Sequence, residues 1–387
     1  MDFVSKLIKK CRNVEDFRNL ARKRLPGPIF NYIDGAAEDE VTYRRNTEAF
    51  NDYDLVPNVL AGVEDIDMSV DVMGFKLDLP IFCSPTALQR LFHHEGERAV
   101  ALAAEKYNTL FGISSLTSTS LKEIDELVDS PKMFQFYFHK DRGLNASMLQ
   151  TAKDANFDIL ALTVDTITGG NRERDLRTGF TSPPRLTLQS FSQFMFKPLW
   201  GLNYLFRKKF ELAELNEHIR EGSSIAISVG DYFSSMLDQS MNWEDVADLR
   251  ESWESKFCLK GIMSAKDARH AVEIGADAIM VSNHGGRQLD GSRSPFDQLD
   301  EIVQAVGGEI EIILDGGIRR ATHILKALAL GATACSGGRM YLYALAAAGR
   351  IGVDRALENL KTEVARDMKL MGIQNLKELT PEMIRRR

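Results

Sequence analysis

Eight short apolar runs follow one another along the chain from residue 79 onward, and each is rich in β-branched or aromatic residues. Runs of this length and composition predict buried β-strands. The segments between them, such as residues 95–108 and 265–276, carry apolar residues at helical spacing. This alternation is typical of parallel strand-helix units. The predicted strands lie at residues 79–85, 109–115, 132–138, 158–165, 257–262, 278–284, 311–317 and 333–339.

Polar side chains at the ends of these strands favour a closed barrel over an open doubly wound sheet. In a barrel the C-terminal ends of all strands meet at one mouth, whereas an open sheet would spread them along an edge. We therefore expect an α/β fold, a (β/α)8 TIM barrel. Its mouth should gather the following residues: Thr86, Ser114, Gln135, Tyr137, Thr163, Asp165, Lys260, His284, Asp315 and Arg339.

Two segments stand outside the repeat, although we expect one domain over residues 1–387. Residues 1–75 form an N-terminal helical segment, with helical patterns at 13–25 and 28–50, and the barrel occupies residues 76–372. Residues 176–242 form an insertion in the fourth unit, far longer than a strand-helix loop requires. Its part 190–210 mixes aromatics with basic residues, and Pro198 should break any helix there. We expect a peripheral membrane contact at 190–210, or else a lid or an oligomer contact, which also needs apolar surface.

Composition and charge narrow the class of protein. With 44% hydrophobic and 27% charged residues, the chain can bury a large core, and its net charge of −7 argues against a protein that coats nucleic acid. The first residues lack the apolar stretch of a secretory signal, and no apolar run is long enough to span a bilayer. We expect a cytoplasmic protein, peripheral on the inner face of the cell membrane if residues 190–210 bind lipid. The four cysteines are widely separated, so no metal site is signalled.

Glycine pairs with a neighbouring arginine follow the last two strands, in "LDGGIRR" (314–320) and "SGGRM" (336–340). Paired glycines let backbone N–H groups approach an anion, and barrels commonly bind phosphate at this place. The pattern predicts a phosphate site. Lys260, which ends an apolar strand, belongs either to a salt bridge at the rim or beside the ring of a phosphate-bearing cofactor.

His284 stands in the motif "SNHGGRQLDG", directly before two glycines and three residues before Arg287. A catalytic base needs an orienting carboxylate, which Asp165 would supply, and an anionic substrate needs a cation. The set predicts proton abstraction from an anionic small molecule. The arginine-rich "GGNRERDLR" (169–177) is either a solvated face or a segment that folds over the mouth.

These motifs together resemble the FMN-dependent L-2-hydroxy-acid oxidases and dehydrogenases, which include glycolate oxidase, flavocytochrome b2, membrane L-lactate dehydrogenase and mandelate dehydrogenase. The resemblance runs almost end to end and implies a barrel that holds FMN. It rests on motifs in the family order: "FNYIDGAAEDE", "SPTAL", "FQFY", "LTVDT", "RERD", "LKGI", "SNHGGRQLD", "LDGGIRR", "LALGA" and "GGR".

The resemblance implies a role for each matching residue. His284 would be the base that removes the substrate α-proton, and Asp165 the carboxylate that stabilises its imidazolium. Arg172 and Arg287 would bind the substrate carboxylate, and Lys260 would lie near the flavin ring. Two tyrosines, Tyr32 and Tyr137, would hydrogen-bond the substrate. The remaining flavin, ribityl and phosphate contacts implied by the resemblance are Pro85, Thr86, Ala87, Ser114, Gln135, Thr163, Asp315, Gly317, Arg319, Gly338 and Arg339.

One departure bears on the substrate. Glycolate oxidases carry a tryptophan where this chain has Leu116, so the resemblance implies room for a larger substrate side chain and favours L-lactate, oxidised to pyruvate. L-Mandelate stays open, because the insertion resembles that of mandelate dehydrogenase. A quinone, oxygen or a separate protein would reoxidise the flavin, with the insertion favouring quinone, and the resemblance implies a homotetramer. A flavin-free, phosphate-binding barrel isomerase is the alternative from another class.

Overall fold

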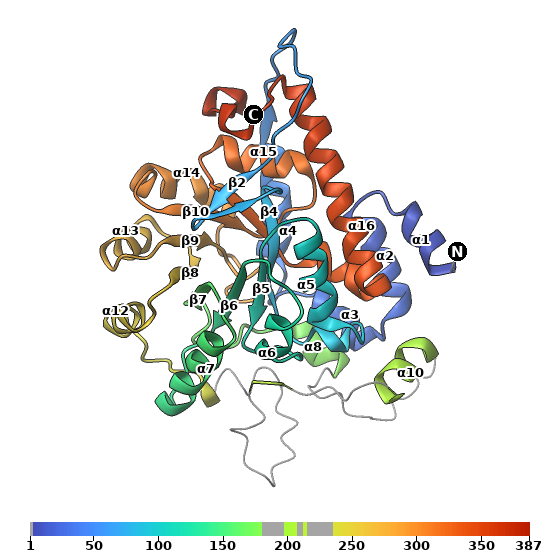
Figure 1. Ribbon diagram of the computed structural model, residues 1–387, viewed down its shortest axis with the longest axis vertical. Helices are drawn as coiled ribbons and strands as arrows, with labels where there is room; N and C mark the ends of the chain where they lie inside the picture. The colour runs from blue at the N-terminus through green and yellow to red at the C-terminus, as the bar shows by residue number, and fades with distance from the viewer. Residues whose placement is uncertain (1–2, 180–196, 207–211, 215–234) are drawn as a thin grey trace.

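A computed structural model describes residues 3–179, 197–206, 212–214 and 235–387, and shows a closed parallel barrel (Figure 1). Neighbouring strands follow the order β10-β11-β4-β5-β6-β7-β8-β9, which closes the sheet on itself. The eight predicted strands are all present, and the predicted TIM barrel is confirmed. The barrel strands are β4 (Ile81–Thr86), β5 (Phe111–Ser114), β6 (Lys132–Phe136), β7 (Ile159–Thr163), β8 (Lys256–Ile262), β9 (Ala278–Val281), β10 (Glu311–Asp315) and β11 (Ala334–Gly337).

The barrel interior changes from apolar to polar along the strand direction. Because side chains alternate between the two faces of a strand, residues two apart point to the same side. An apolar layer of Phe82, Met133, Ala161, Cys258, Met280, Ile313 and Ala334 fills the lower interior. Two residues further along the same strands stand Ser84, Gln135, Thr163, Lys260, Ser282, Asp315 and Ser336. The strand pattern therefore places a polar layer at the mouth, directly above a packed apolar core.

A small hairpin closes the opposite end of the barrel. Strands β2 (Val70–Val72) and β3 (Phe75–Leu77) pair antiparallel, and Val72, Met73 and Leu77 join the interior apolar cluster. Helices surround the barrel, and their buried faces pack on the outward-facing side chains of the strands (Figure 1). They are α5 (Gly96–Lys106), α6 (Leu121–Asp125), α7 (Arg142–Asp154), α12 (Trp243–Ser252), α13 (Ala265–Glu273), α14 (Pro295–Val306), α15 (Ala321–Ala329) and α16 (Arg339–Met371).

The N-terminal segment is helical, as predicted, but its second helical pattern is divided. Helix α1 spans Phe3–Lys10 and α2 spans Val14–Arg24, while residues 28–50 form α3 (Gly27–Asp34), α4 (Val41–Glu48) and the start of a 3-10 turn, η1 (Ala49–Asp52). The break falls where Glu38 and Glu40 adopt positive φ, of 45° and 59°. This left-handed backbone cannot continue a right-handed helix, so α3 and α4 run separately.

The two ends of the fold meet in a second small sheet. Strand β1 (Tyr53–Leu55) pairs antiparallel with β12 (Ile384–Arg386), and Arg387 forms an ion pair with Asp54. Two further short 3-10 turns, η3 (Leu376–Glu378) and η4 (Pro381–Met383), precede β12. Helix α16 is kinked at Ala348 and Gly349, and a Cβ at Gly349 would overlap the carboxylate of Glu95.

The fourth unit is interrupted between β7 and α12, and only part of the interruption falls within the described residues. Helix α8 (Glu173–Thr178) opens it, and α10 (Pro198–Phe206) follows. As expected, no helix runs through Pro198: Lys197 is not helical, and Pro198 begins α10, at the position where a missing N–H costs nothing. The rest of the predicted 190–210 contact, residues 190–196 and 207–210, lies outside the described residues.

Candidate active site

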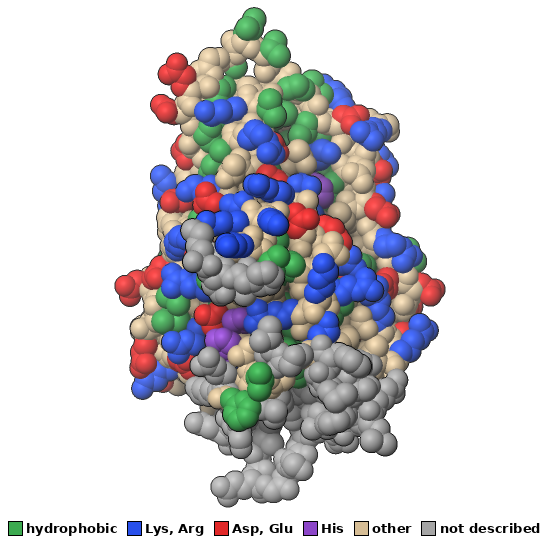
Figure 2. Space-filling model, turned by 90° about the vertical axis from the view of Figure 1, so that its right-hand side faces the viewer, with side chains coloured by type: hydrophobic (Ala, Val, Ile, Leu, Met, Phe, Trp, Pro, Cys, Tyr) green, Lys and Arg blue, Asp and Glu red, His purple; other side chains and the backbone are tan. Residues whose placement is uncertain are grey.

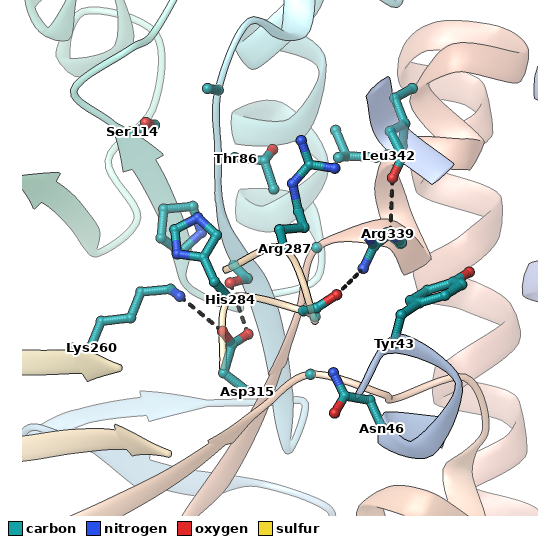
Figure 3. A pocket seen from close by; sticks show the side chains of 18 of the residues that line it. Tyr43, Asn46, Thr86, Ser114, Lys260, His284, Arg287, Asp315, Arg339 and Leu342 are labelled. Carbon is teal, nitrogen blue, oxygen red and sulfur yellow. Dashed lines mark hydrogen bonds and ion pairs between the residues drawn. The ribbon is translucent and has the colours of Figure 1, made fainter. Parts of the chain in front are cut away.

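A cavity opens at the C-terminal end of the barrel, with an empty volume of about 1060 Å³ that includes its part open to solvent (Figure 3). It gathers every site residue predicted from the sequence except Asp165, which stands behind His284. The structure thus brings residues from every barrel strand or the loop after it, and from the N-terminal segment, to one place. The predicted residues that line the cavity are Tyr32, Pro85, Thr86, Ala87, Ser114, Leu116, Gln135, Tyr137, Thr163, Arg172, Lys260, His284, Arg287, Asp315, Gly317, Arg319, Gly338 and Arg339.

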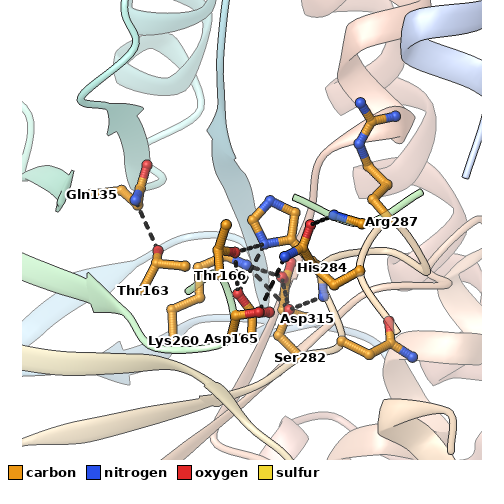
Figure 4. Close-up of polar contacts among 12 residues, drawn as sticks. Gln135, Thr163, Asp165, Thr166, Lys260, Ser282, His284, Arg287 and Asp315 are labelled. Carbon is orange, nitrogen blue, oxygen red and sulfur yellow. Dashed lines mark hydrogen bonds and ion pairs between the residues drawn. The ribbon is translucent and has the colours of Figure 1, made fainter. Parts of the chain in front are cut away.

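His284 is held at the mouth by a carboxylate and a hydroxyl (Figure 4). Its Nδ1 lies 3.0 Å from Asp165 Oδ1 and 3.3 Å from Thr166 Oγ1, and Thr166 also donates to Asp165 Oδ1 at 2.8 Å. The φ of His284 is 58°, a sparsely populated conformation for a residue with a side chain. Such strain persists only where the surroundings enforce it. The backbone and the Asp165 carboxylate together leave Nε2 as the nitrogen available to a ligand.

The charges around this pair favour a neutral imidazole beside an ionised carboxylate. Burial lowers the pKa of His284 below its ordinary value of 6.5, although the attraction of Asp165 opposes the change. Burial alone would raise the pKa of Asp165, but His284 and Lys260 lower it overall. A buried neutral histidine with a carboxylate on its second nitrogen is suited to accept a proton, because the carboxylate stabilises the imidazolium that forms.

Two arginines near His284 create a site for an anion. Arg287 donates through Nη1 to the carbonyl oxygens of Tyr32 (2.6 Å) and Gly35 (2.8 Å), and its guanidinium lies over the Tyr32 ring. Burial, together with repulsion from Arg172, lowers the pKa of Arg287 to about 10. A bound carboxylate would relieve that repulsion and match the planar fork of a guanidinium. Burial also raises the pKa of Tyr137, which therefore stays a neutral hydrogen-bonding group.

Lys260 and Asp315 form a buried ion pair across the polar layer, with Nζ 3.1 Å from Oδ2. The carboxylate also accepts from the hydroxyls of Ser282 (2.7 Å), Ser84 (2.9 Å) and Ser336 (2.7 Å). Burial disfavours the charge on Lys260, but the attraction of Asp315 and Asp165 raises its pKa overall. Lys260 is therefore a permanent cation at the cavity wall. The predicted salt bridge is present, and Lys260 also lines the cavity.

Three polar side chains on adjacent strands form a hydrogen-bonded row along the cavity wall, which reaches Lys260 at its Thr163 end. Ser114 Oγ donates to Gln135 Oε1 at 3.0 Å. Gln135 Nε2 in turn donates to Thr163 Oγ1 at 2.8 Å, the bond drawn in Figure 4. All three are buried. Since hydroxyls and amides have both donor and acceptor capacity, this row can meet the polar edge of a flat heterocycle.

The far end of the cavity has the features of an anion site. Gly316 and Gly317 adopt positive φ, of 117° and 74°, and a Cβ at Gly317 would overlap the carbonyl oxygen of Asn46. Thr47 Oγ1 fixes this loop by donating to Gly317 O at 3.1 Å. Among the described residues no carboxylate forms an ion pair with Arg319. The loop therefore offers backbone groups and a guanidinium that can serve a phosphate.

Arg339 joins this end of the cavity to the N-terminal segment. Its Nε donates to the carbonyl of Ile33 at 2.8 Å, its Nη2 to that of Gly35 at 2.8 Å, and its Nη1 to that of Gly285 at 2.9 Å. Its guanidinium lies 4.5 Å from the centre of the Tyr43 ring. The C-terminal carbonyls of α3, where the helix dipole is negative, are thus bound by Arg287 and Arg339 together.

Sequence reasoning missed several lining residues, three of them on α4. Asn46 forms paired amide hydrogen bonds with Asn283, at 2.9 and 2.8 Å, which dock α4 beside His284. The only local signal was the asparagine of "SNHGG", whose partner lies far away in the sequence. The missed lining residues are Ile33, Tyr43, Asn46, Thr47, Ser84, Phe92, Gly285, Gly316, Ile318, Gly337 and Leu342.

Comparisons with known proteins give consistent matches over nearly the whole chain. Residues 21–386 match the family described as FMN-dependent dehydrogenase. Glycolate oxidase from Spinacia oleracea is 37% identical over 368 residues, which cover 95% of this chain and 94% of that protein. L-Lactate dehydrogenase from Alcaligenes faecalis is 37% identical over 370 residues, with 95% and 97% covered. The structure of the monotopic membrane protein (S)-mandelate dehydrogenase is similar with a TM-score of 0.91 at 33% identity, and covers 98% of this chain and 100% of that one.

Proposed function

Because this chain belongs to the FMN-dependent 2-hydroxy-acid dehydrogenase family and so oxidises L-2-hydroxy acids with FMN, we propose that its substrate is L-lactate, which it converts to pyruvate. The observation that carries the proposal is the meeting of a neutral, carboxylate-backed histidine with two mutually repelling arginines in one cavity. FMN is the cofactor of the family, so the flavin-free isomerase is set aside.

The residues of the cavity fit FMN. The loop of Gly316 and Gly317 with Arg319 suits the phosphate, because a Cβ at Gly317 would fill the space against α4 and the guanidinium has no carboxylate partner among the described residues. The row of Ser114, Gln135 and Thr163 suits the polar edge of the ring. Lys260 supplies positive charge at the wall. When bound, FMN serves as a two-electron acceptor for the substrate.

The protein's own groups would act on the substrate as follows. Arg172 and Arg287 bind its carboxylate and so fix the α-carbon, which converts a bimolecular encounter into an oriented one. Tyr32 and Tyr137 hydrogen-bond the substrate beside them. Neutral His284 accepts a proton at Nε2 as the two substrate electrons leave, and Asp165 stabilises the imidazolium.

Substrate size supports lactate over glycolate. Leu116 lines the cavity as a buried side chain that is 3% exposed, beside the small Ala87. This apolar wall suits a substrate methyl group, whose burial favours binding by about 0.8 kcal/mol. L-Mandelate is the second candidate, supported by the similarity to (S)-mandelate dehydrogenase over the whole chain.

We propose a membrane quinone as the electron acceptor, with the insertion as the membrane contact. On α10, Leu202 and Phe206 are 53% and 78% exposed, while Trp200 is buried and donates from Nε1 to Leu91 O at 2.7 Å. Trp200 thus fixes the helix to the body, and α10 presents apolar side chains outward on the face of the molecule that Figure 2 shows. No helix of the described residues is long and apolar enough to cross a bilayer. The homotetramer stays a prediction, to be checked by light scattering.

An anaerobic titration of the visible spectrum tests the chemistry. We expect L-lactate to bleach the oxidised flavin band faster than L-mandelate or glycolate. Faster bleaching by L-mandelate would identify L-mandelate as the substrate in place of L-lactate. Bleaching by none of the L-acids would refute the proposed function. His284→Gln should retain FMN and lose several orders of magnitude in turnover; near-normal turnover would reject His284 as the base.

Liposome flotation tests the membrane contact. We expect the intact protein to float with anionic liposomes and a variant lacking residues 190–210 to remain in the dense bottom fraction. Equal flotation of the two proteins would refute membrane binding through this segment.

A further inference from the structure

Gln288 follows Arg287 in the loop after β9, and the proposed function gives it no role. Its side chain is partly buried and crosses to the loop after β7, which runs from Asp165 to Arg172. These two loops carry the groups proposed to bind the substrate carboxylate and to orient His284. Gln288 therefore lies at a contact where the spacing of those groups can be fixed from outside the cavity.

The amide of Gln288 is engaged on both sides. Nε2 donates to the carbonyl oxygens of Thr168 at 2.8 Å and Asp165 at 3.2 Å. Oε1 accepts from the backbone N–H of Gly170 at 3.3 Å and from Arg172 Nη2 at 3.4 Å. The surroundings determine the orientation of the amide, since carbonyls require the NH2 group and N–H donors require the oxygen.

The two loops are also pressed together at the backbone. A Cβ at Gly170 would overlap the carbonyl oxygens of Arg287 and Gln288, so only glycine permits this approach. Arg172 adds a bond from Nε to the carbonyl oxygen of Arg287 at 3.4 Å. The guanidinium of Arg172 is thus held by the loop that carries Arg287, through one backbone oxygen and the Gln288 amide.

We propose that Gln288 is a positioning residue that sets Arg172 against Arg287 and so determines the affinity for the substrate carboxylate. The inference rests on the proposed function, because it assumes that these arginines bind that carboxylate. Gln288 touches neither substrate nor cofactor in this scheme and acts through Arg172.

The test uses the FMN-bound enzyme and oxalate, a dianion without an α-hydrogen, whose binding is followed by the change in the flavin spectrum. Gln288→Met keeps the length of the side chain and removes its hydrogen bonds. We expect the Kd for oxalate and the KM for L-lactate to rise about tenfold, as for a loss of about 1.4 kcal/mol, while kcat changes less than about threefold. Gln304→Met is the matched control, because Gln304 lies on α14 and bonds only Asp300 in an exposed pair.

A double-mutant cycle separates positioning from general loosening. In the background of Arg172→Met, adding Gln288→Met should raise the oxalate Kd less than about twofold, because the residue through which Gln288 acts is gone. Should Gln288→Met lose FMN, Gln288→Glu replaces it: the carboxylate would face two carbonyls and compete for Arg172, so the oxalate Kd should again rise.

The outcomes distinguish this inference from the proposed function. A wild-type enzyme that binds oxalate and turns over L-2-hydroxy acids supports the function. If Gln288→Met or Gln288→Glu then binds oxalate as tightly as Gln304→Met, or if the cycle is additive, the role of Gln288 is refuted alone. A wild type that binds no carboxylate refutes the function, and the inference with it.

Discussion

Asp34, at the end of α3, is 1% exposed and ties three parts of the fold together. Arg18 on α2 donates to its two oxygens at 2.6 and 3.0 Å, Arg174 on α8 at 2.9 Å, and Tyr343 on α16 at 2.8 Å. Arg174 also pairs with Glu40. Because α3 carries Tyr32 and α8 directly follows Arg172, this network fixes two sides of the cavity.

Asp34→Asn keeps the shape and removes the charge. Burial disfavours the charged form of Asp34, but the bonds from Arg18 and Tyr343 outweigh it and lower the pKa from 3.8 to about 2. That difference corresponds to roughly 2.5 kcal/mol in favour of the ionised form. Arg18 and Arg174 keep 31% and 35% exposure, so water can partly solvate them when the partner is lost. We expect the free energy of unfolding to fall by about 2–3 kcal/mol at pH 7, the low end for breaking a buried pair.

The assay is equilibrium unfolding in urea, which leaves ionic strength unchanged, at saturating FMN so that cofactor binding contributes equally. The pH dependence supplies a second readout. The folded-state pKa lies below the unfolded value, so the contribution of Asp34 is fully present above about pH 4 and is lost as the pH falls toward 2. The gap between wild type and Asp34→Asn should therefore be constant from pH 7 to 5 and shrink below pH 4.

Glu15→Gln is the matched control. Glu15 pairs with the same Arg18 at 3.0 Å, but its side chain is 59% exposed, so its loss should cost less than about 0.5 kcal/mol. Equal losses for the two variants would refute the reasoning from burial. A gap that persists unchanged at pH 3 would refute the charge as its cause.

Three further predictions follow from the site and the core. Gly317→Ala places a methyl group against Asn46 O at positive φ, so fluorescence titration of the apoprotein should give an FMN Kd raised at least about tenfold; an unchanged Kd contradicts the close approach. Since the neutral form of His284 reacts and burial lowers its pKa below 6.5, kcat/KM should stay level from pH 8 to 7 and fall as the pH drops through that lowered pKa. Asp165→Asn removes an attraction that raises the pKa of His284, so the fall in kcat/KM should move to lower pH. A move to higher pH would contradict the pairing of His284 with Asp165. Burial raises the pKa of all four cysteine thiols, those of Cys11, Cys83, Cys258 and Cys335. An aromatic disulfide reagent should therefore label none of them in the folded protein and all four after unfolding. Rapid labelling of the native protein would show that a thiol lies at the surface and would contradict this prediction.

The barrel and most of its mouth could be predicted from the sequence because both depend on local patterns. Each strand is a short apolar run, and the alternation of its side chains decides which residues reach the interior. Lys260 and Asp315 stand two residues beyond the interior Cys258 and Ile313, so a register that buries the apolar pair also brings the charged pair together. No long-range information is needed for this step.

The features that were not predicted depend on contacts between distant segments. The break between α3 and α4 begins at Gly35, the C-cap of α3, and continues through Glu38 and Glu40, whose positive φ no local residue type signals. The pairing of β1 with β12 joins Tyr53 to Arg386, and no local pattern marks either strand. Asn46 became a site residue only through its amide pairing with Asn283.

The binding of the α3 carbonyls by Arg287 and Arg339 has a consequence for the order of assembly. Tyr32 and Ile33 leave the ribosome early, yet their arginine partners follow 255 and 306 residues later. The carbonyl oxygens of Tyr32 and Ile33 can therefore accept both of these hydrogen bonds only after Arg339, which follows the final barrel strand, has been synthesised. Contacts of such long sequence separation form slowly, since loop closure must precede them. The mouth is thus completed only when α3 docks onto loops that are synthesised long after it.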